Sequence, residues 1–334
     1  MAALSGSAGL AGFLAVDALT SGSSIDFDVS AALGEPASLA ATYYPARTAD
    51  RGRAVLCCLP GGTYSRHYWD LHVPGHYGYS FADFAAGNGY SVLTIDPLGT
   101  GESSKPTSDF DFTHIAATLA EVVSAVPDVT GDDRPVVAVA HSLGGYLAIT
   151  QQALYSSYAG LAVLGCTNKQ VAPLNLSPDF IARAATPQGR TALAGEILAA
   201  LSAPYVEGPR DDLQSWFHLP DVPSAVIEAD SAATKSVVPR VFGLAMIPGI
   251  VSEHAATIDV PVLIGYGATD VSPDPRAEAA MYRNSPDLTT VILSGSAHCH
   301  NMASSRHRLW RRLLAWAATV VDEPAGQLSG RHRD

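Results

Sequence analysis

A serine joins an apolar run to a helix-like run, which is the setting of a nucleophile. Residues 135–140 read PVVAVA, a pattern typical of a buried strand, and a helix-compatible pattern begins at Leu143. The turn at Ser142 must be sharp, and the small residues Ala140 and Gly144 on either side permit it. The N-terminus of the following helix would stabilise an oxyanion beside the hydroxyl. Ser142 is therefore a candidate nucleophile, and the simpler alternative is that it only caps the helix.

Two further segments accompany this turn. Pro60-Gly61-Gly62 follows an apolar strand-like run, and Asp96-Pro-Leu-Gly-Thr-Gly-Glu-Ser103 follows another. Together with Ala140-His-Ser-Leu-Gly144 they resemble the α/β-hydrolase superfamily, over nearly the whole chain outside residues 169–256. The superfamily usually has Gly where this chain has Ala140, and Ala is the mildest departure. The resemblance implies a serine hydrolase with the catalytic order Ser, acid, His.

A serine hydroxyl needs a base, and histidine can take up and return a proton near pH 7. The chain has 11 histidines, and His298 lies in Ser294-Gly-Ser-Ala-His298, which resembles the superfamily's histidine loop. We predict His298 as the base, with His300 as the alternative. The acid must follow a strand between Ser142 and His298, and Asp270 meets both conditions. Asp274 lies between two prolines, which favours a turn or a helix start there.

An oxyanion needs two fixed donors. We predict the backbone N–H of Leu143 as one donor and that of Gly62 as the other, with Thr63 as the alternative to Gly62. Aromatic and histidine side chains after this loop and in the 169–256 region are candidates for the substrate pocket, although most can equally be core residues. They are Tyr64, His67, Tyr68, Trp69, Tyr205, Trp216, Phe217 and Met246.

Metal and phosphate sites are not expected. His67, Asp70, His72 and His76 fit no spacing in which ligands share a helix face or close a known loop. The glycines between Asp96 and Ser103 lack the lysine and the longer loop that a phosphate-binding loop requires. We therefore expect neither a metal nor a cofactor.

The elements that must position these residues alternate between strand-like and helix-like patterns, which predicts a mostly parallel central sheet with helices on both faces. The 169–256 region breaks the alternation, so we predict core residues 1–168 and 257–334 with an inserted helical lid at 169–256. The expected strands are 24–31, 38–44, 55–59, 91–95, 135–140, 161–164, 260–266 and 289–293. The expected helical stretches are 81–87, 112–126, 143–154, 191–202, 224–238, 275–282 and 304–321.

Bulk properties narrow the partners and the location. The formal charge of −12 disfavours nucleic acid and anionic membranes, and no stretch is apolar enough for a membrane span. Residues 1–16 lack the basic start of a secretory signal, and the four cysteines have no disulfide spacing. We expect a cytoplasmic monomer or homodimer with a polar tail at 322–334.

The expected function is hydrolysis of a carboxylic ester, lactone or related acyl bond in a small, largely apolar substrate, through an acyl-serine intermediate. One alternative is carbon–carbon bond hydrolysis or lyase chemistry on the same three residues. Another is a binding protein without catalysis. The superfamily branches that use aspartate at the turn are disfavoured by Ser142.

Overall fold

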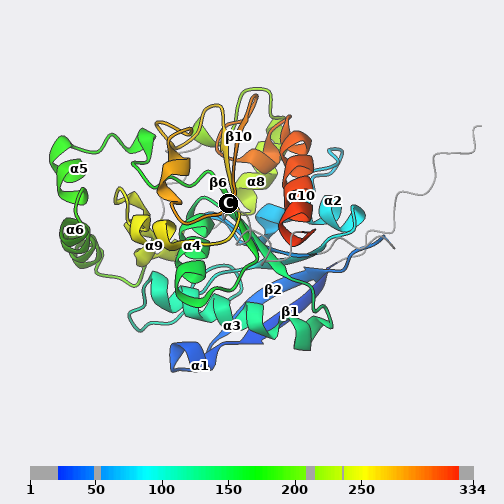
Figure 1. Ribbon diagram of the computed structural model, residues 1–334, viewed down its shortest axis with the longest axis horizontal. Coiled ribbons are helices and arrows are strands. Elements are labelled where there is room, and N and C mark those ends of the chain that lie inside the picture. The colour runs from blue at the N-terminus through cyan, green and yellow to red at the C-terminus, as the bar shows by residue number, and fades with distance from the viewer. Residues whose placement is uncertain (1–21, 49–53, 208–214, 235–236, 323–334) are drawn as a thin grey trace, which may run out of the picture.

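The computed structural model describes residues 22–48, 54–207, 215–234 and 237–322. Its centre is an eight-stranded sheet in the order β1-β2-β4-β3-β5-β6-β9-β10, and Figure 1 shows helices packed around this sheet. The strands are β1 (Ser23–Asp28), β2 (Ser38–Tyr44), β3 (Val55–Leu59), β4 (Ser91–Ile95), β5 (Val136–His141), β6 (Gly160–Leu164), β9 (Val262–Gly267) and β10 (Leu288–Leu293). The predicted fold class, a mostly parallel α/β sheet, is confirmed.

The direction of the strands brings the loops of interest together. β1 and β2 pair antiparallel, and β2 pairs antiparallel with β4, whereas β4, β3, β5, β6, β9 and β10 run parallel. Leu59 at the end of β3 is paired with Ala140 near the end of β5. Because parallel strands end at one edge, the segments around Gly62, Ser142, Asp270 and His298 meet there.

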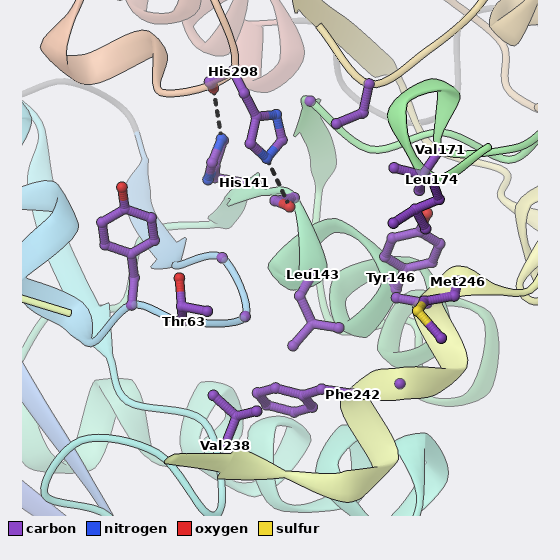
Figure 2. A pocket seen from close by; sticks show the side chains of 18 of the residues that line it. Thr63, His141, Leu143, Tyr146, Val171, Leu174, Val238, Phe242, Met246 and His298 are labelled. Carbon is purple, nitrogen blue, oxygen red and sulfur yellow. Dashed lines mark hydrogen bonds between the residues drawn. The ribbon is translucent and has the colours of Figure 1, made fainter. Parts of the chain in front are cut away.

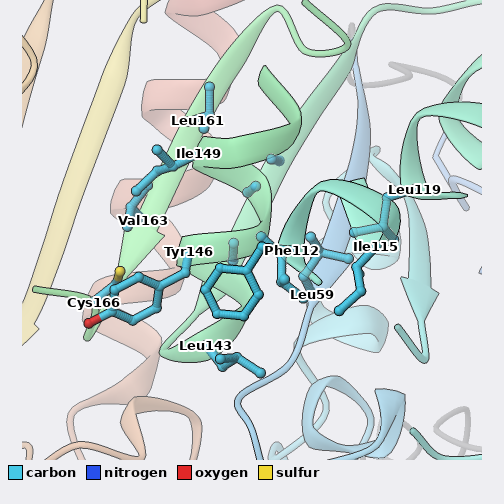
Figure 3. Packing of buried hydrophobic residues seen from close by; sticks show 14 of the residues in the cluster. Leu59, Phe112, Ile115, Leu119, Leu143, Tyr146, Ile149, Leu161, Val163 and Cys166 are labelled. Atoms are coloured by element: carbon cyan, nitrogen blue, oxygen red, sulfur yellow. The ribbon is translucent and has the colours of Figure 1, made fainter. Parts of the chain in front are cut away.

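Helices cover both faces of the sheet, and each face has its own buried cluster. One face carries α3 (Phe112–Thr130), α4 (Leu143–Tyr155) and α9 (Ser252–Thr257), and the other carries α2 (Phe81–Gly87) and α10 (Arg306–Asp322). Figure 3 shows side chains of α3 and α4 packed beside Leu59 and Val163 of the strands. This packing fixes α4, and with it the serine at its start.

The 169–256 region lies between β6 and β9. It contains a second, antiparallel sheet of two strands, which is separate from the central sheet. Its elements are η2 (Ala172–Leu174), α5 (Pro178–Ala184), α6 (Pro187–Ala200), β7 (Tyr205–Glu207), α8 (Ser224–Ala232), β8 (Val237–Pro239) and η3 (Arg240–Met246), besides α9. Whether this region acts as a lid, and where its boundaries fall, stays a prediction.

Three sequence predictions of secondary structure are wrong in part. The strand expected at 24–31 ends at Asp28, whose side chain accepts a hydrogen bond from the Ser30 N–H (3.0 Å) and allows the short helix α1 (Ser30–Leu33) to begin. The helix expected at 224–238 stops at Ala232, and Val237–Pro239 forms β8 instead. The stretch 275–282 contains only the 3₁₀ turn η4 (Glu278–Met281).

The ends of the chain lie outside the described residues, so the predictions for residues 1–16 and for the tail beyond residue 322 remain predictions. Within the described ranges, none of the helices combines the length and the apolar character that crossing a bilayer requires. The four cysteines are free and buried.

Candidate active site

Ser142 lies in the strained turn between β5 and α4. Its backbone has φ 52° and ψ −119°, and its N–H donates a hydrogen bond to the Leu164 carbonyl (2.7 Å). A Cβ at Gly144 would lie 2.6 Å from the Leu59 carbonyl oxygen, so only glycine fits there. The Ser142 side chain makes no capping hydrogen bond, which excludes the helix-cap interpretation in this conformation.

Three side chains predicted to act together form one hydrogen-bonded chain. The Ser142 hydroxyl lies 3.0 Å from Nε2 of His298, and Nδ1 of His298 lies 2.7 Å from Oδ1 of Asp270. His298 is 4% exposed and the Asp270 side chain is fully buried. The geometry allows the hydroxyl to donate to a neutral imidazole whose other N–H is fixed by the carboxylate. Figure 2 labels His298 and marks its hydrogen bond to the serine with a dashed line.

The Asp270 carboxylate is held by more than one ring. Nε2 of His300 donates to Oδ2 (2.7 Å), and the backbone N–H groups of Gly267 (2.8 Å) and Val271 (2.7 Å) donate as well. Burial alone would raise the pKa of Asp270, but the charges and hydrogen bonds of His298 and His300 hold it well below its usual range. His300 therefore contacts the acid and not the serine, which leaves His298 as the base candidate.

His141, which was not predicted as a site residue, contacts the backbone of His298. Its Nε2 donates to the carbonyl oxygen of His298 (2.9 Å), and its ring stacks on Tyr68 at 4.6 Å. Burial, followed by the neighbouring His298 and His300, lowers its pKa well below the usual value. His141 is consequently neutral at pH 7 and fixes the backbone of the histidine loop.

The loop predicted to complete the oxyanion site lies beside the serine. Gly62, Thr63 and Leu143 all line the same cavity, and a Cβ at Gly62 would lie 3.6 Å from Cβ of Leu143. The choice between Gly62 and Thr63 as the second donor stays a prediction.

The Asp96 segment holds the chain that follows this loop. Asp96 is fully buried, accepts a hydrogen bond from the Arg66 N–H (2.6 Å) and forms an ion pair with the Arg66 guanidinium. A Cβ at Gly101 would lie 2.0 Å from an Asp96 carboxylate oxygen, so the glycine permits this close approach. The segment thus has a structural role beside the site.

A cavity of about 380 Å³ opens beside the serine (Figure 2). Of the predicted pocket residues, Tyr64, Trp216, Phe217 and Met246 line it. Further apolar residues come mainly from the 169–256 region, and Glu207 adds a carboxylate. The additional apolar residues are Val171, Leu174, Leu201, Val206, Val238, Phe242 and Ala245 from that region, and Val271 from the core.

Other predicted pocket residues lie elsewhere. His67 is exposed and is not part of the cavity wall. Tyr68 is buried under His141, and Trp69 is fully buried against Phe81 at 5.5 Å. These aromatic residues follow the oxyanion loop in the 3₁₀ turn η1 (Arg66–Trp69), which directs their rings into the core instead of the cavity. Tyr205 also lies outside the wall and donates to the Pro106 carbonyl oxygen (3.0 Å).

One glycine of the site was not predicted from the sequence. Gly165 follows β6 with φ 57°, and a Cβ there would lie 3.0 Å from the His298 ring. Its position directly after a predicted strand is a signal that could have pointed to it.

Two groups of side chains offer metal-ligand atoms within 4.8 Å of one another in the described residues: His218, Asp230 and Cys299, and Asp70, His72 and Asp83. The first group is buried, and its hydrogen bonds are described below. The expectation that the chain uses no metal stays a prediction.

Comparison with known proteins identifies the family. Residues 54–312 match the model of a family described as the alpha/beta hydrolase family, so the chain belongs to that family and is an α/β-hydrolase. None of the curated protein sequences compared with it matches significantly.

Solved structures with the same fold have distant sequences. A soluble variant of monoglyceride lipase from Saccharomyces cerevisiae, bound to a substrate analogue, is 17% identical with a TM-score of 0.66, over 93% of this chain and 99% of that chain. A thermophilic esterase from Thermogutta terrifontis is 18% identical with a TM-score of 0.62, over 90% and 99%. A bromoperoxidase from Bacillus anthracis is 15% identical with a TM-score of 0.61, over 89% and 100%. At these identities the likeness concerns the fold.

Proposed function

We propose that this protein is a serine hydrolase that cleaves a carboxylic ester, a lactone or a related acyl bond. The observation that carries the proposal is the unbroken chain from the Ser142 hydroxyl through His298 to the buried Asp270, with spacings of 3.0 and 2.7 Å. The esterase and the monoglyceride lipase that share this fold are consistent with it.

The reaction follows from the proton path. Ser142 Oγ attacks the carbonyl carbon while Nε2 of His298 takes its proton, and the resulting oxyanion is held by the N–H groups of Leu143 and of Gly62 or Thr63. The alcohol leaves with the proton from His298, and an acyl-serine remains. Water then attacks this ester while Nε2 of His298 takes its proton, and His298 returns that proton to Ser142 Oγ as the carboxylic acid leaves.

The cavity supports an apolar substrate of modest size. Its volume of about 380 Å³ and its mainly aliphatic and aromatic wall favour an acyl chain, because apolar surface is driven out of water into such a site. Glu207 is a carboxylate on this wall, and it disfavours an anionic substrate at that position.

A fluorophosphonate probe tests the serine directly, because it reacts with an activated serine whatever the natural substrate is. We expect labelling of Ser142, identified by mass spectrometry, together with turnover of p-nitrophenyl butyrate. Ser156 is a matched control, because it is an exposed serine that also has a positive φ (48°) and should remain unlabelled. Turnover of a carbon–carbon substrate without any labelling of Ser142 would contradict the acyl-serine mechanism.

A further inference from the structure

One part of the 169–256 region contacts both loops of the candidate site through its backbone. The His298 N–H donates to the Trp216 carbonyl oxygen (3.1 Å), and the Cys299 N–H donates to the Phe217 carbonyl oxygen (2.9 Å). Tyr64, next to the oxyanion loop, forms an antiparallel bridge with Thr234. We call residues 215–234 the brace, because they contact the histidine loop at one end and the oxyanion loop at the other.

A buried polar cluster joins the two ends of the brace. The Tyr64 hydroxyl donates to Oδ2 of Asp230 (2.8 Å), and Nε2 of His218 donates to the same oxygen (3.0 Å). Sγ of Cys299 lies 3.0 Å from the Tyr64 oxygen. Asp230 is fully buried, and the other three are at most 9% exposed. The cluster thus connects α8, the segment at His218, the oxyanion loop and the histidine loop.

The position of Asp230 in its helix is unusual. Val222, Val226 and Asp230 are spaced by four residues and form the buried face of this segment. Packing alone would favour a third apolar residue, because burying a carboxylate costs free energy unless hydrogen bonds compensate for it. The carboxylate binds Tyr64, which lies next to the oxyanion loop, so we infer that Asp230 acts on the active site.

We propose that Asp230, supported by His218, is a positioning residue that sets the oxyanion loop relative to His298. The proposal rests on the proposed acyl-serine function. Asp230 fixes the Tyr64 hydroxyl, and Tyr64 directly follows Thr63, one of the two candidates for the second oxyanion donor. A donor displaced by about 1 Å can cost roughly 100-fold in rate, so losing a hydrogen bond that fixes this loop should have a large effect on kcat.

The positioning role predicts a particular kinetic pattern. Asp230→Asn keeps an acceptor oxygen but removes the negative charge, which weakens the hydrogen bonds that this oxygen accepts from Tyr64 and His218. Tyr64→Phe removes the hydroxyl altogether. We expect each variant to lower kcat and the rate of fluorophosphonate labelling of Ser142 by roughly 10- to 100-fold, with KM changed less than about threefold. The double variant should be no slower than the slower single variant, because both changes break one connection.

A chemically similar cluster provides the control. The Tyr44 hydroxyl donates to Asp70 (2.6 Å), which also contacts His72 (2.8 Å), and none of the three lines the cavity. Tyr44→Phe and Asp70→Asn should leave kcat within about twofold of wild type, because they remove the same kind of hydrogen bond away from the cavity.

The two His218 variants test the second partner of Asp230. His218→Gln should retain most of the kcat because its amide N–H can still donate to Asp230, whereas His218→Leu should behave like Asp230→Asn.

The experiment measures kcat, KM and labelling rate for these variants in the full-length chain, with thermal unfolding to confirm that each is folded. If Asp230→Asn fails to fold, Tyr64→Phe and His218→Leu carry the test. Unchanged kcat and labelling in the folded brace variants would overturn the positioning role while the proposed function stands. One equivalent of zinc in the wild type that is lost in Asp230→Asn would also overturn it, because His218, Asp230 and Cys299 would then be metal ligands. Absence of both turnover and labelling in the wild type would overturn the proposed function, and the brace proposal with it.

Discussion

The two halves of the region between β6 and β9 are built differently. The arm, residues 172–207, buries little: α5 has only Ala184 as a buried residue, and α6 has only Arg190 and Leu193. In Figure 1, α5 and α6 extend away from the sheet at the left. The brace, residues 215–234, instead packs Phe217, Val222 and Val226 into the cluster that contains α10.

The polar contacts of the two halves differ as well. The arm is fastened by ion pairs whose carboxylates are open to water: Arg190 pairs with Glu253, which is 56% exposed, and Arg240, which also donates to the Leu201 carbonyl oxygen (3.0 Å), pairs with Asp109, which is 83% exposed. The brace is fastened by the buried bonds of Asp230. An exposed ion pair contributes about 0–1 kcal/mol to the free energy of unfolding, whereas breaking a buried hydrogen-bond network costs more.

From this difference we expect the arm and the brace to affect catalysis in different ways. The arm contributes Leu174, Leu201 and Val206 to the cavity wall and touches none of the candidate catalytic residues through a hydrogen bond in the described structure. The brace contacts the backbone of His298 directly. Changes in the arm should therefore alter KM and substrate choice, and changes in the brace should alter kcat.

The largest effect should come from Asp270, the candidate acid beside His298. Asp270→Asn keeps the shape but removes the negative charge that fixes the His298 tautomer. We expect kcat to fall about 10³- to 10⁴-fold with little change in KM, measured on p-nitrophenyl butyrate. This sets the scale for kcat effects in the brace. A loss of less than tenfold would mean that Asp270 does not orient the base.

The next effect tests the packing of the brace. Phe217 is 7% exposed and stacks on the His298 ring with centroids 5.7 Å apart. Phe217→Ala should lower the free energy of unfolding by about 3 kcal/mol, as for other buried phenylalanines, and should lower kcat as His298 loses its support. Urea unfolding and steady-state kinetics measure the two. A stable variant with normal kcat would remove the distinction between brace and arm.

The pH dependence of stability tests His141, which binds the backbone of the histidine loop. Because burial lowers the pKa of His141, the folded state keeps it neutral while an unfolded histidine takes up a proton below pH ~6.5. Stability should therefore fall as pH drops below ~6.5, by up to ~1.4 kcal/mol per pH unit from this residue. In His141→Gln that part of the slope should vanish. An identical slope in both proteins would contradict a neutral, buried His141.

A smaller effect is expected from the arm. Leu201 is partly buried and lines the cavity. Leu201→Ala should raise KM for p-nitrophenyl octanoate about threefold to tenfold, since it removes apolar contact with a long acyl chain, and should leave kcat within about twofold. The acetate ester serves as the control because it does not reach far along the wall. A fall in kcat with unchanged KM would show that the arm, like the brace, positions catalytic groups.

The smallest effect should come from salt. At about 1 M NaCl the exposed pairs of Arg190 and Arg240 are screened, whereas the buried bonds of Asp230 are not. We expect a change in KM of less than about threefold and no change in the rate of fluorophosphonate labelling. A strong loss of labelling would mean that surface charge, and not the brace, holds the catalytic loops.

Much of the fold could be predicted because its signals are local. Val55–Leu59 and Ser91–Ile95 are short apolar runs bounded by turn residues, and their predicted limits match the strands. The three candidate catalytic residues could be predicted because each follows a strand at the same edge, and the structure brings them within hydrogen-bond distance. By contrast, the end of α8 and the start of β8 depend on pairing with the distant β7, which no local pattern reveals.

The brace was hidden for a similar reason. Tyr64, Cys299 and the pair His218 and Asp230 come from three separate parts of the sequence, and no local pattern brings them together. The same limit explains Tyr68 and Trp69: their aromatic character indicated burial, but only the three-dimensional turn of η1 decides that they face the core.

The central claim is that Ser142 is the nucleophile, and one measurement tests it most directly. Hydrolysis of p-nitrophenyl acetate and butyrate should be measured without added metal for wild type, Ser142→Ala and Ser156→Ala. We predict turnover by wild type and Ser156→Ala, and a loss in Ser142→Ala of at least about 10³-fold in kcat. Equal activity in wild type and Ser142→Ala would contradict the account.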